Sequence, residues 1–177
     1  PGRVDNGILR EYLDRIDPFF DCFLRYRRDW KNIITYMQRV SPGEYGQTPS
    51  LSVQGKYTVK GDHGSRNSAN EAALEALARI GFLQDLEIVA GQSVAFRFRD
   101  ANIRWWLRDV GSVLELYVYK ACIDAGIFND VISSAVVRWD ETLGHGSVLN
   151  EIDVMAARGV IPLFISCKAT DIKTEAL

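Results

Sequence analysis

Residues 150–168, NEIDVMAARGVIPLFISCK, combine two apolar runs with ionisable side chains that core strands rarely carry. The runs IDVMAA and IPLFIS are typical of adjacent strands joined by a short turn. Because strand side chains alternate between faces, Ser166 and Lys168 share one face and Cys167 takes the other. If the two strands pair, we expect Asp153 to lie close to Ser166 and Lys168.

A carboxylate, a hydroxyl and an ammonium on one patch have two chemical interpretations. The simpler one is an ion pair between Asp153 and Lys168 at the end of the sheet, because a buried charge without a partner is costly. The other is a divalent metal site, since oxygen-rich clusters suit Mg²⁺ or Mn²⁺. A nearby ammonium would then stabilise negative charge on a reacting phosphate. The residues alone leave both interpretations open.

Glu115 is a third candidate and precedes these strands in the sequence. GSVLELYVYKAC (111–122) predicts a helix that begins at Ser112 and continues to about Gly126. Glu115 stands three residues after Ser112, which is the spacing of a capping box. It is equally a carboxylate that can help to bind a metal, and both roles are compatible with the sequence.

The elements that position these residues fill the last third of the chain. Asp100 is expected to cap a short helix, which comes before the helix at Ser112. VISSAVVRWD (131–140) is strand-like, ETLGHGS (141–147) is typical of a turn, and residues 150–168 supply two more strands. The predicted order is helix, strand, strand, strand and then the start of another helix.

The first 50 residues are expected to be helical and then to form a loop. Asp17–Pro18 predicts an N-cap with proline at the first helical position, starting a longer helix that ends near Val40. SPGEYGQTPS (41–50) has the composition of a loop and marks the best candidate boundary.

Residues 51–100 predict a small module of a helix followed by a hairpin. Ser68 and Glu71 are spaced as a capping box for a helix that closes at Gly81. Two strands follow within 86–100, on either side of a glycine-containing turn. This succession is the outline of a winged helix.

The composition limits the class of protein. The chain has 177 residues, of which 47% are hydrophobic and 25% charged, as in soluble globular proteins. A net charge of -2 argues against a polyanion-binding surface over the whole molecule, although a local basic groove remains possible. Three scattered cysteines favour a reducing cytoplasm, and two histidines without metal-ligand spacing argue against zinc. No apolar run is long enough to predict a membrane span.

A helix with an acid, a strand with an aspartate and then x-x-Lys resembles the PD-(D/E)XK nucleases, which have the restriction-endonuclease-like fold. GSVLELYVYKAC and LNEIDVMAARGVIPLFISCK look like the nuclease domain of CRISPR-associated sensor–effector proteins, which join a cyclic-oligoadenylate-binding (CARF) domain to such a nuclease. The resemblance is close from about residue 100 to 170 and only an outline upstream.

The resemblance implies an α+β or α/β chain in three parts. These are a helical connecting region (1–45), a winged-helix-like module (46–100) and a C-terminally truncated α-β-β-β-α nuclease-like domain (101–177). It also implies a homodimer whose sensor domain lies outside this sequence, so we expect the chain to be a fragment.

By the same resemblance, Asp153 binds Mg²⁺ or Mn²⁺, Lys168 lies near the attacked phosphate, and Glu115 completes metal or water binding. Cys167 would offer its backbone carbonyl to the metal. Ser166 departs from the family pattern because it stands where a second acid is usual, and serine is a poorer Mg²⁺ ligand. The implied function is metal-dependent hydrolysis of DNA or RNA; the alternative is a non-catalytic nucleic-acid-binding module with a degenerate nuclease fold.

Basic residues upstream offer a candidate nucleic-acid surface. In RYRRDWK, Arg25, Arg28 and Lys31 are spaced to form a phosphate-contacting stripe along the expected long helix. A solvated helix face explains them equally well.

Overall fold

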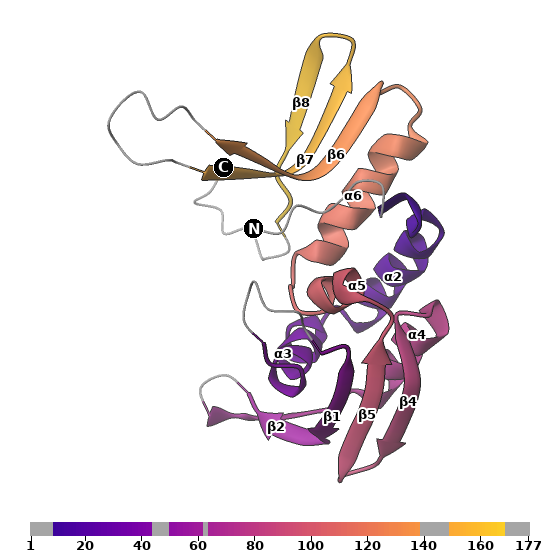
Figure 1. Ribbon diagram of the computed structural model, residues 1–177, viewed down its shortest axis with the longest axis vertical. Helices are drawn as coiled ribbons and strands as arrows, with labels where there is room; N and C mark the ends of the chain where they lie inside the picture. The colour runs from indigo at the N-terminus through magenta and orange to yellow at the C-terminus, as the bar shows by residue number, and fades with distance from the viewer. Residues whose placement is uncertain (1–8, 44–49, 62–63, 139–148, 169–177) are drawn as a thin grey trace, which may run out of the picture. The chain divides into compact units, whose positions relative to one another are not determined.

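The computed structural model describes residues 9–43, 50–61, 64–138 and 149–168 (Figure 1). Within these ranges the chain contains both helices and antiparallel sheets, so the predicted α+β class is confirmed. None of the helices in these ranges is both long and apolar enough to cross a membrane. Contacts divide the chain into unit 1, Pro1–Ile16 with Val113–Leu177, and unit 2, Asp17–Ser112. The division at residues 45 and 100 stays a prediction.

Unit 2 combines helices with a three-stranded antiparallel sheet of order β1-β5-β4 and a separate β2-β3 ladder. Its core is aromatic: the Phe19 and Phe82 rings meet edge to face with centroids 5.0 Å apart, and Trp30 lies 5.8 Å from Phe19. Its elements are α2 (Leu13–Tyr26, which begins in unit 1), α3 (Trp30–Val40), β1 (Ser52–Lys56), β2 (Thr58–Lys60), β3 (Arg66–Ser68), α4 (Glu71–Ile80), β4 (Leu83–Val89), β5 (Ser93–Phe98) and α5 (Ala101–Trp106).

The single long helix predicted after Pro18 is wrong. Helix α2 begins earlier, at Leu13, and encloses Pro18, while a turn at residues 27–29 separates it from α3. The break lets Trp30 pack against Phe23 of α2, with ring centroids 5.5 Å apart. Apolar spacing could not reveal the break, because both helices turn their apolar faces to the same core.

The helix α4 and the β4–β5 hairpin confirm the predicted helix and hairpin, but the predicted N-cap is wrong. Ser68 belongs to strand β3, and the cap is Asn70, whose side chain accepts a hydrogen bond from the Ala73 amide at 3.0 Å. Asn70 also donates to Asp29 at 2.8 Å, so tertiary contacts fix the start of α4. Gly81 closes the helix in a left-handed conformation, as predicted. The winged-helix assignment stays a prediction.

The C-terminal part of unit 1 follows the predicted order of one helix and three strands. It contains α6 (Ser112–Asp124), β6 (Asp130–Arg138), β7 (Leu149–Arg158) and β8 (Ile161–Ile165), and the strands form an antiparallel sheet of order β6-β7-β8. The helix predicted after Lys168 lies outside the described residues, and the restriction-endonuclease core stays a prediction.

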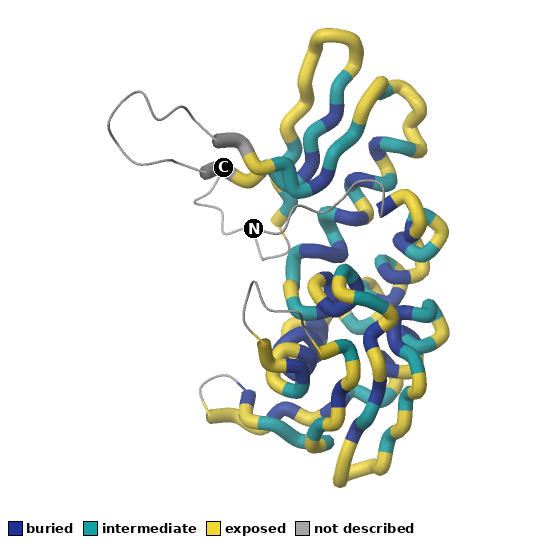
Figure 2. The backbone as a smooth tube through the Cα atoms, in the orientation of Figure 1, coloured by how far each residue is buried: buried dark blue, intermediate teal, exposed yellow. Residues whose placement is uncertain are grey.

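The sheet of unit 1 has one covered face. Val154 and Ala156 of β7 are 0% and 1% exposed, whereas Asp153 and Met155, which alternate with them, point to the opposite face and are half-buried. The β8 edge is largely exposed, as the yellow hairpin tip in Figure 2 shows. The alternation therefore places Asp153 on the more open face.

A glycine holds β1 against α3 in unit 2. A Cβ atom at Gly55 would lie 2.8 Å from Val40 Cγ1 and 2.9 Å from Val40 Cβ. Gly55→Ala is therefore expected to reduce the free energy of unfolding by about 1–3 kcal/mol, measured by denaturant unfolding. In the double-mutant cycle Val40→Ala, which removes Cγ1 and keeps Cβ, should recover part of that loss; two additive effects would show that the contact with Cγ1 is not the cause.

Candidate active site

The carboxylate of Asp153 is the centre of the candidate site. The Cys167 backbone amide donates to Asp153 Oδ2 at 2.6 Å, and the Ser166 hydroxyl donates to the same oxygen at 3.2 Å. Hydrogen bonds to an ionised carboxylate are stronger than those between neutral groups. Among the described residues no hydrogen bond reaches Asp153 Oδ1, so one oxygen is held and the other remains available.

The strand register brings these residues together. Val154 pairs with Ile165, so Asp153 lies opposite Ser166 at the next position. The hairpin turns at Gly159, which has a left-handed φ of 60° and donates its amide to Asn129 Oδ1 at 2.5 Å. The predicted hairpin and the proximity of Asp153 to Ser166 are confirmed.

The prediction that residues 166–168 continue the strand is wrong. Strand β8 ends at Ile165, and the chain then leaves the ladder. This departure lets the Cys167 amide reach the Asp153 side chain instead of a neighbouring backbone carbonyl. Alternation along an unbroken strand could not predict that bond.

The backbone opposite Asp153 is also irregular. On β6, Ser133 pairs with Val154 and Ala135 with Ile152, which leaves Ser134 opposite Asp153 without a regular pair. Ser134 has a φ of 52°, a conformation that costs a residue with a Cβ of the order of 1–3 kcal/mol. Such strain is concentrated at functional sites, and here it coincides with the carboxylate.

Helix α6 contributes a second carboxylate close to the Cys167 thiol. Burial, together with the smaller effect of the negative charges of Asp153 and Glu115, raises the pKa of Cys167 to about 11. Both carboxylates therefore lie within electrostatic range of this thiol. Cys122, one of the lesser causes of the shift, follows Glu115 by seven residues on the same face of α6.

Ser112 and Glu115 do not form the capping box that was one of the two roles open to Glu115. The Ser112 amide and hydroxyl both donate to Asp109 Oδ2, at 2.7 and 2.9 Å, so Asp109 satisfies the start of α6. Because Asp109 takes this role, the side chain of Glu115 is not needed to cap the helix.

Asp153 and Lys168, both of which the structure describes, do not form the ion pair of the simpler interpretation. Lys168 is exposed, and no salt bridge joins it to Asp153 within 4.0 Å. Its ammonium follows Cys167 directly in the chain and lies in solvent, where it is accessible to an anionic ligand.

The donors fit a hydrated Mg²⁺ or Mn²⁺ ion better than zinc. Within the part of the chain that the structure describes, no group of three or more His, Cys, Asp and Glu side chains could hold a metal. A typical zinc site needs three or four such ligands, whereas Mg²⁺ keeps several waters and uses one or two carboxylates with substrate phosphates. The available Asp153 Oδ1 meets that smaller requirement.

The basic residues of the upstream surface do not share one helix. Arg25 lies in α2, Arg28 in the following turn and Lys31 in α3, and all three are exposed. The predicted stripe on one helix face is therefore wrong in its geometry, and a phosphate-binding role for these residues stays a prediction.

The sequence did not indicate two features of the site, the Cys167 amide and the strained Ser134. The hairpin register alone would have placed Cys167 one residue beyond the pair of Asp153 and Ser166. Nothing in VISSAVV marks Ser134, because serine has no preference for a left-handed conformation.

Comparison with known proteins gives little further evidence. No protein-family model matches the chain, and no curated protein matches it. A solved structure of Can2 from Sulfobacillus thermosulfidooxidans in complex with cyclic tetra-adenylate matches with a TM-score of 0.48 and 15% sequence identity. The match covers 94% of this chain and 38% of that chain, so this chain spans well under half of Can2. A likeness at this TM-score carries no argument about function.

The raised pKa of Cys167 predicts a thiol that is protonated and poorly nucleophilic at neutral pH. Its alkylation by iodoacetamide in EDTA, followed by peptide mass spectrometry, should keep accelerating up to about pH 11. In the unfolded chain the same thiol should level off near 9.0. A folded-state profile that also levels off near 9.0 would contradict the burial and the nearby carboxylates.

Proposed function

We propose that this chain is the metal-dependent nuclease part of a larger protein and hydrolyses phosphodiester bonds in nucleic acid. The observation that carries the proposal is the held carboxylate: Asp153 is fixed through one oxygen by Ser166 and Cys167, while its other oxygen is available. Lys168 follows as an exposed cation, and the residue pattern resembles that of PD-(D/E)XK nucleases.

Asp153, the carbonyl of Cys167 and Glu115 are the residues that would hold Mg²⁺ or Mn²⁺. The ion would lower the pKa of a water and neutralise charge on the scissile phosphate. This donor set is small, so the proposed affinity is weak and benefits from the phosphate oxygens of the substrate.

In this proposal the residues of the chain orient the Asp153 carboxylate and stabilise the charge that develops on the phosphate. The Cys167 amide and the Ser166 hydroxyl restrict rotation of the Asp153 carboxylate, so that Oδ1 keeps a constant direction. Lys168 supplies an ammonium that stabilises negative charge as it develops on the phosphate. Glu115 adds a negative charge from α6. Its charge and that of Asp153 both raise the pKa of the Cys167 thiol.

The biological setting rests on the sequence resemblance. It implies a cytoplasmic, homodimeric CRISPR-associated effector whose nuclease is activated by a cyclic oligoadenylate bound to a separate sensor domain. We include this setting in the proposal, and the experiments below use the full-length protein for that reason.

The proposal predicts cleavage that depends on Asp153. The full-length protein should be incubated with plasmid DNA, single-stranded DNA and single-stranded RNA, in Mg²⁺ or Mn²⁺, with and without candidate cyclic oligoadenylates. Asp153→Asn should abolish cleavage because it removes the charge on the proposed metal ligand. Lys168→Gln should lower the rate by on the order of 100-fold.

The matched control is Asp124→Asn, which makes the same change at an exposed aspartate of α6 paired with Lys120. Its cleavage should equal that of the wild type. Cleavage that survives Asp153→Asn, or no cleavage under any of these conditions, would disprove the assignment.

A second candidate function is nucleic-acid binding without catalysis. Ser166 favours it, because a hydroxyl that donates to Asp153 occupies the position where an acid would add a second charge. The small number of acidic ligands among the described residues points the same way.

Ser166→Glu separates the two functions. Under the nuclease proposal the wild type cleaves, and the added carboxylate should lower the Mn²⁺ concentration needed for half-maximal cleavage. Cleavage assays across a Mn²⁺ titration measure this, with Ser166→Gln as the uncharged control of similar size. An inert wild type together with an active Ser166→Glu variant would instead support the degenerate fold.

A further inference from the structure

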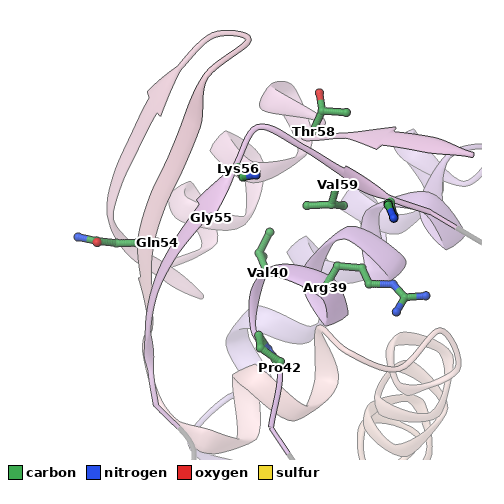
Figure 3. A pocket seen from close by; sticks show the side chains of 9 residues that line it. Arg39, Val40, Pro42, Gln54, Gly55, Lys56, Thr58 and Val59 are labelled. Carbon is green, nitrogen blue, oxygen red and sulfur yellow. The ribbon is translucent and has the colours of Figure 1, made fainter. Parts of the chain in front are cut away.

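A pocket in unit 2 lies outside the candidate active site. It opens between the end of α3 and the strands β1 and β2, and its volume is about 540 Å³ (Figure 3). Cavities of this size accommodate nucleotide-sized ligands. The sequence analysis did not identify it; the two lysines of KYTVK (56–60), four residues apart, were the signal available there.

The charge of the lining is of one sign. Arg39 comes from α3, Lys56 from the end of β1 and Lys60 from the end of β2, and the lining contains no acidic side chain. Among the described residues neither Lys56 nor Lys60 forms a salt bridge. Two lysines without a salt bridge, at a hollow whose lining contains no carboxylate, favour an anionic ligand.

The other residues of the lining suit contacts with the sugar–phosphate backbone of a nucleic acid better than contacts with its bases. Val40 and Val59 point toward one another across the pocket (Figure 3), where they can contact a sugar. Thr58 also lines the pocket, and its hydroxyl is hydrogen-bonded to the Ser68 hydroxyl at 2.9 Å. No aromatic side chain lines the pocket, so it offers no platform on which a base could stack.

Hydrogen bonds fix the backbone at the corner between β1 and β2, which carries Lys56. The Tyr36 hydroxyl donates to the Lys56 carbonyl at 3.0 Å, and the Tyr57 amide donates to the Gln92 carbonyl at 3.1 Å. The Tyr57 hydroxyl donates to Glu71 of α4 at 2.6 Å. The corner between β1 and β2 is thus tied to three other segments, and a rigid site loses less entropy when a ligand binds.

We propose that this pocket binds the phosphates of a single nucleic-acid strand, independently of base sequence. Arg39, Lys56 and Lys60 neutralise the phosphates, and Val40 and Val59 contact the sugar between them. Binding here does not require hydrolysis, so it is independent of the proposed nuclease activity.

Fluorescence anisotropy tests the proposal with the whole chain in EDTA, which excludes cleavage. The probe is a fluorescein-labelled 12-nucleotide oligothymidylate, with an oligouridylate and a 12-base-pair duplex as further arms. Lys56→Gln/Lys60→Gln should weaken binding of both single strands by about tenfold or more at 0.1 M salt. The slope of log affinity against log salt should fall in magnitude by about 1.4, since each phosphate contact on a single strand contributes about 0.7.

The matched control is Arg79→Gln/Arg97→Gln, which removes the same charge from exposed arginines outside the pocket. This pair should change affinity less than threefold, and circular dichroism should show that both double variants are folded.

Three results would overturn the proposal. One is an equal loss in both double variants, which would reflect net charge alone. Another is duplex affinity that falls as much as single-strand affinity in Lys56→Gln/Lys60→Gln. The third is complete displacement of the oligonucleotide by inorganic phosphate at the same phosphate concentration, which would identify a site for free phosphate.

Discussion

The hydrogen bond from the Cys167 amide to Asp153 Oδ2, 2.6 Å long, is the interaction on which the candidate site depends. It forms only because β8 ends at Ile165 and the chain leaves the ladder one residue before Cys167. The same bond turns the carboxylate, with help from Ser166, so that Oδ1 is left for another ligand. The Cys167 amide, which in a longer strand would bond to a neighbouring backbone carbonyl, thus orients the Asp153 carboxylate.

The local backbone is consistent with a constraint imposed by function and not by stability. Asp153 lies within the apolar run IDVMAA of β7, and Ser134 opposite to it has a left-handed φ of 52°. The covered face of the strand needs neither feature, since Val154 and Ala156 bury it fully. Strain and an acid at the same point of a sheet indicate a site whose geometry matters more than the free energy it costs.

Much of unit 1 could be predicted from the sequence because its signals are local. Period-two alternation and a glycine at the turn define the hairpin, and that hairpin alone brings Asp153 to Ser166. The error at α6 is local, because Asp109, three residues before Ser112, takes the hydrogen bonds at the start of that helix. The errors at α2 and α4 have tertiary causes: Trp30 packs back onto α2, and the bond from Asn70 to Asp29 fixes the residue that caps α4. Spacing within one segment cannot reveal a partner from another segment.

The central claim is that Asp153 Oδ1 binds a divalent metal. Anomalous diffraction from crystals of the full-length protein soaked in Mn²⁺ tests it without reference to activity. The account predicts an anomalous peak about 2.1 Å from Oδ1, also within reach of the Cys167 carbonyl, that disappears in Asp153→Asn crystals. A map with no peak at Asp153, or with the same peak in the Asp153→Asn crystals, would contradict it.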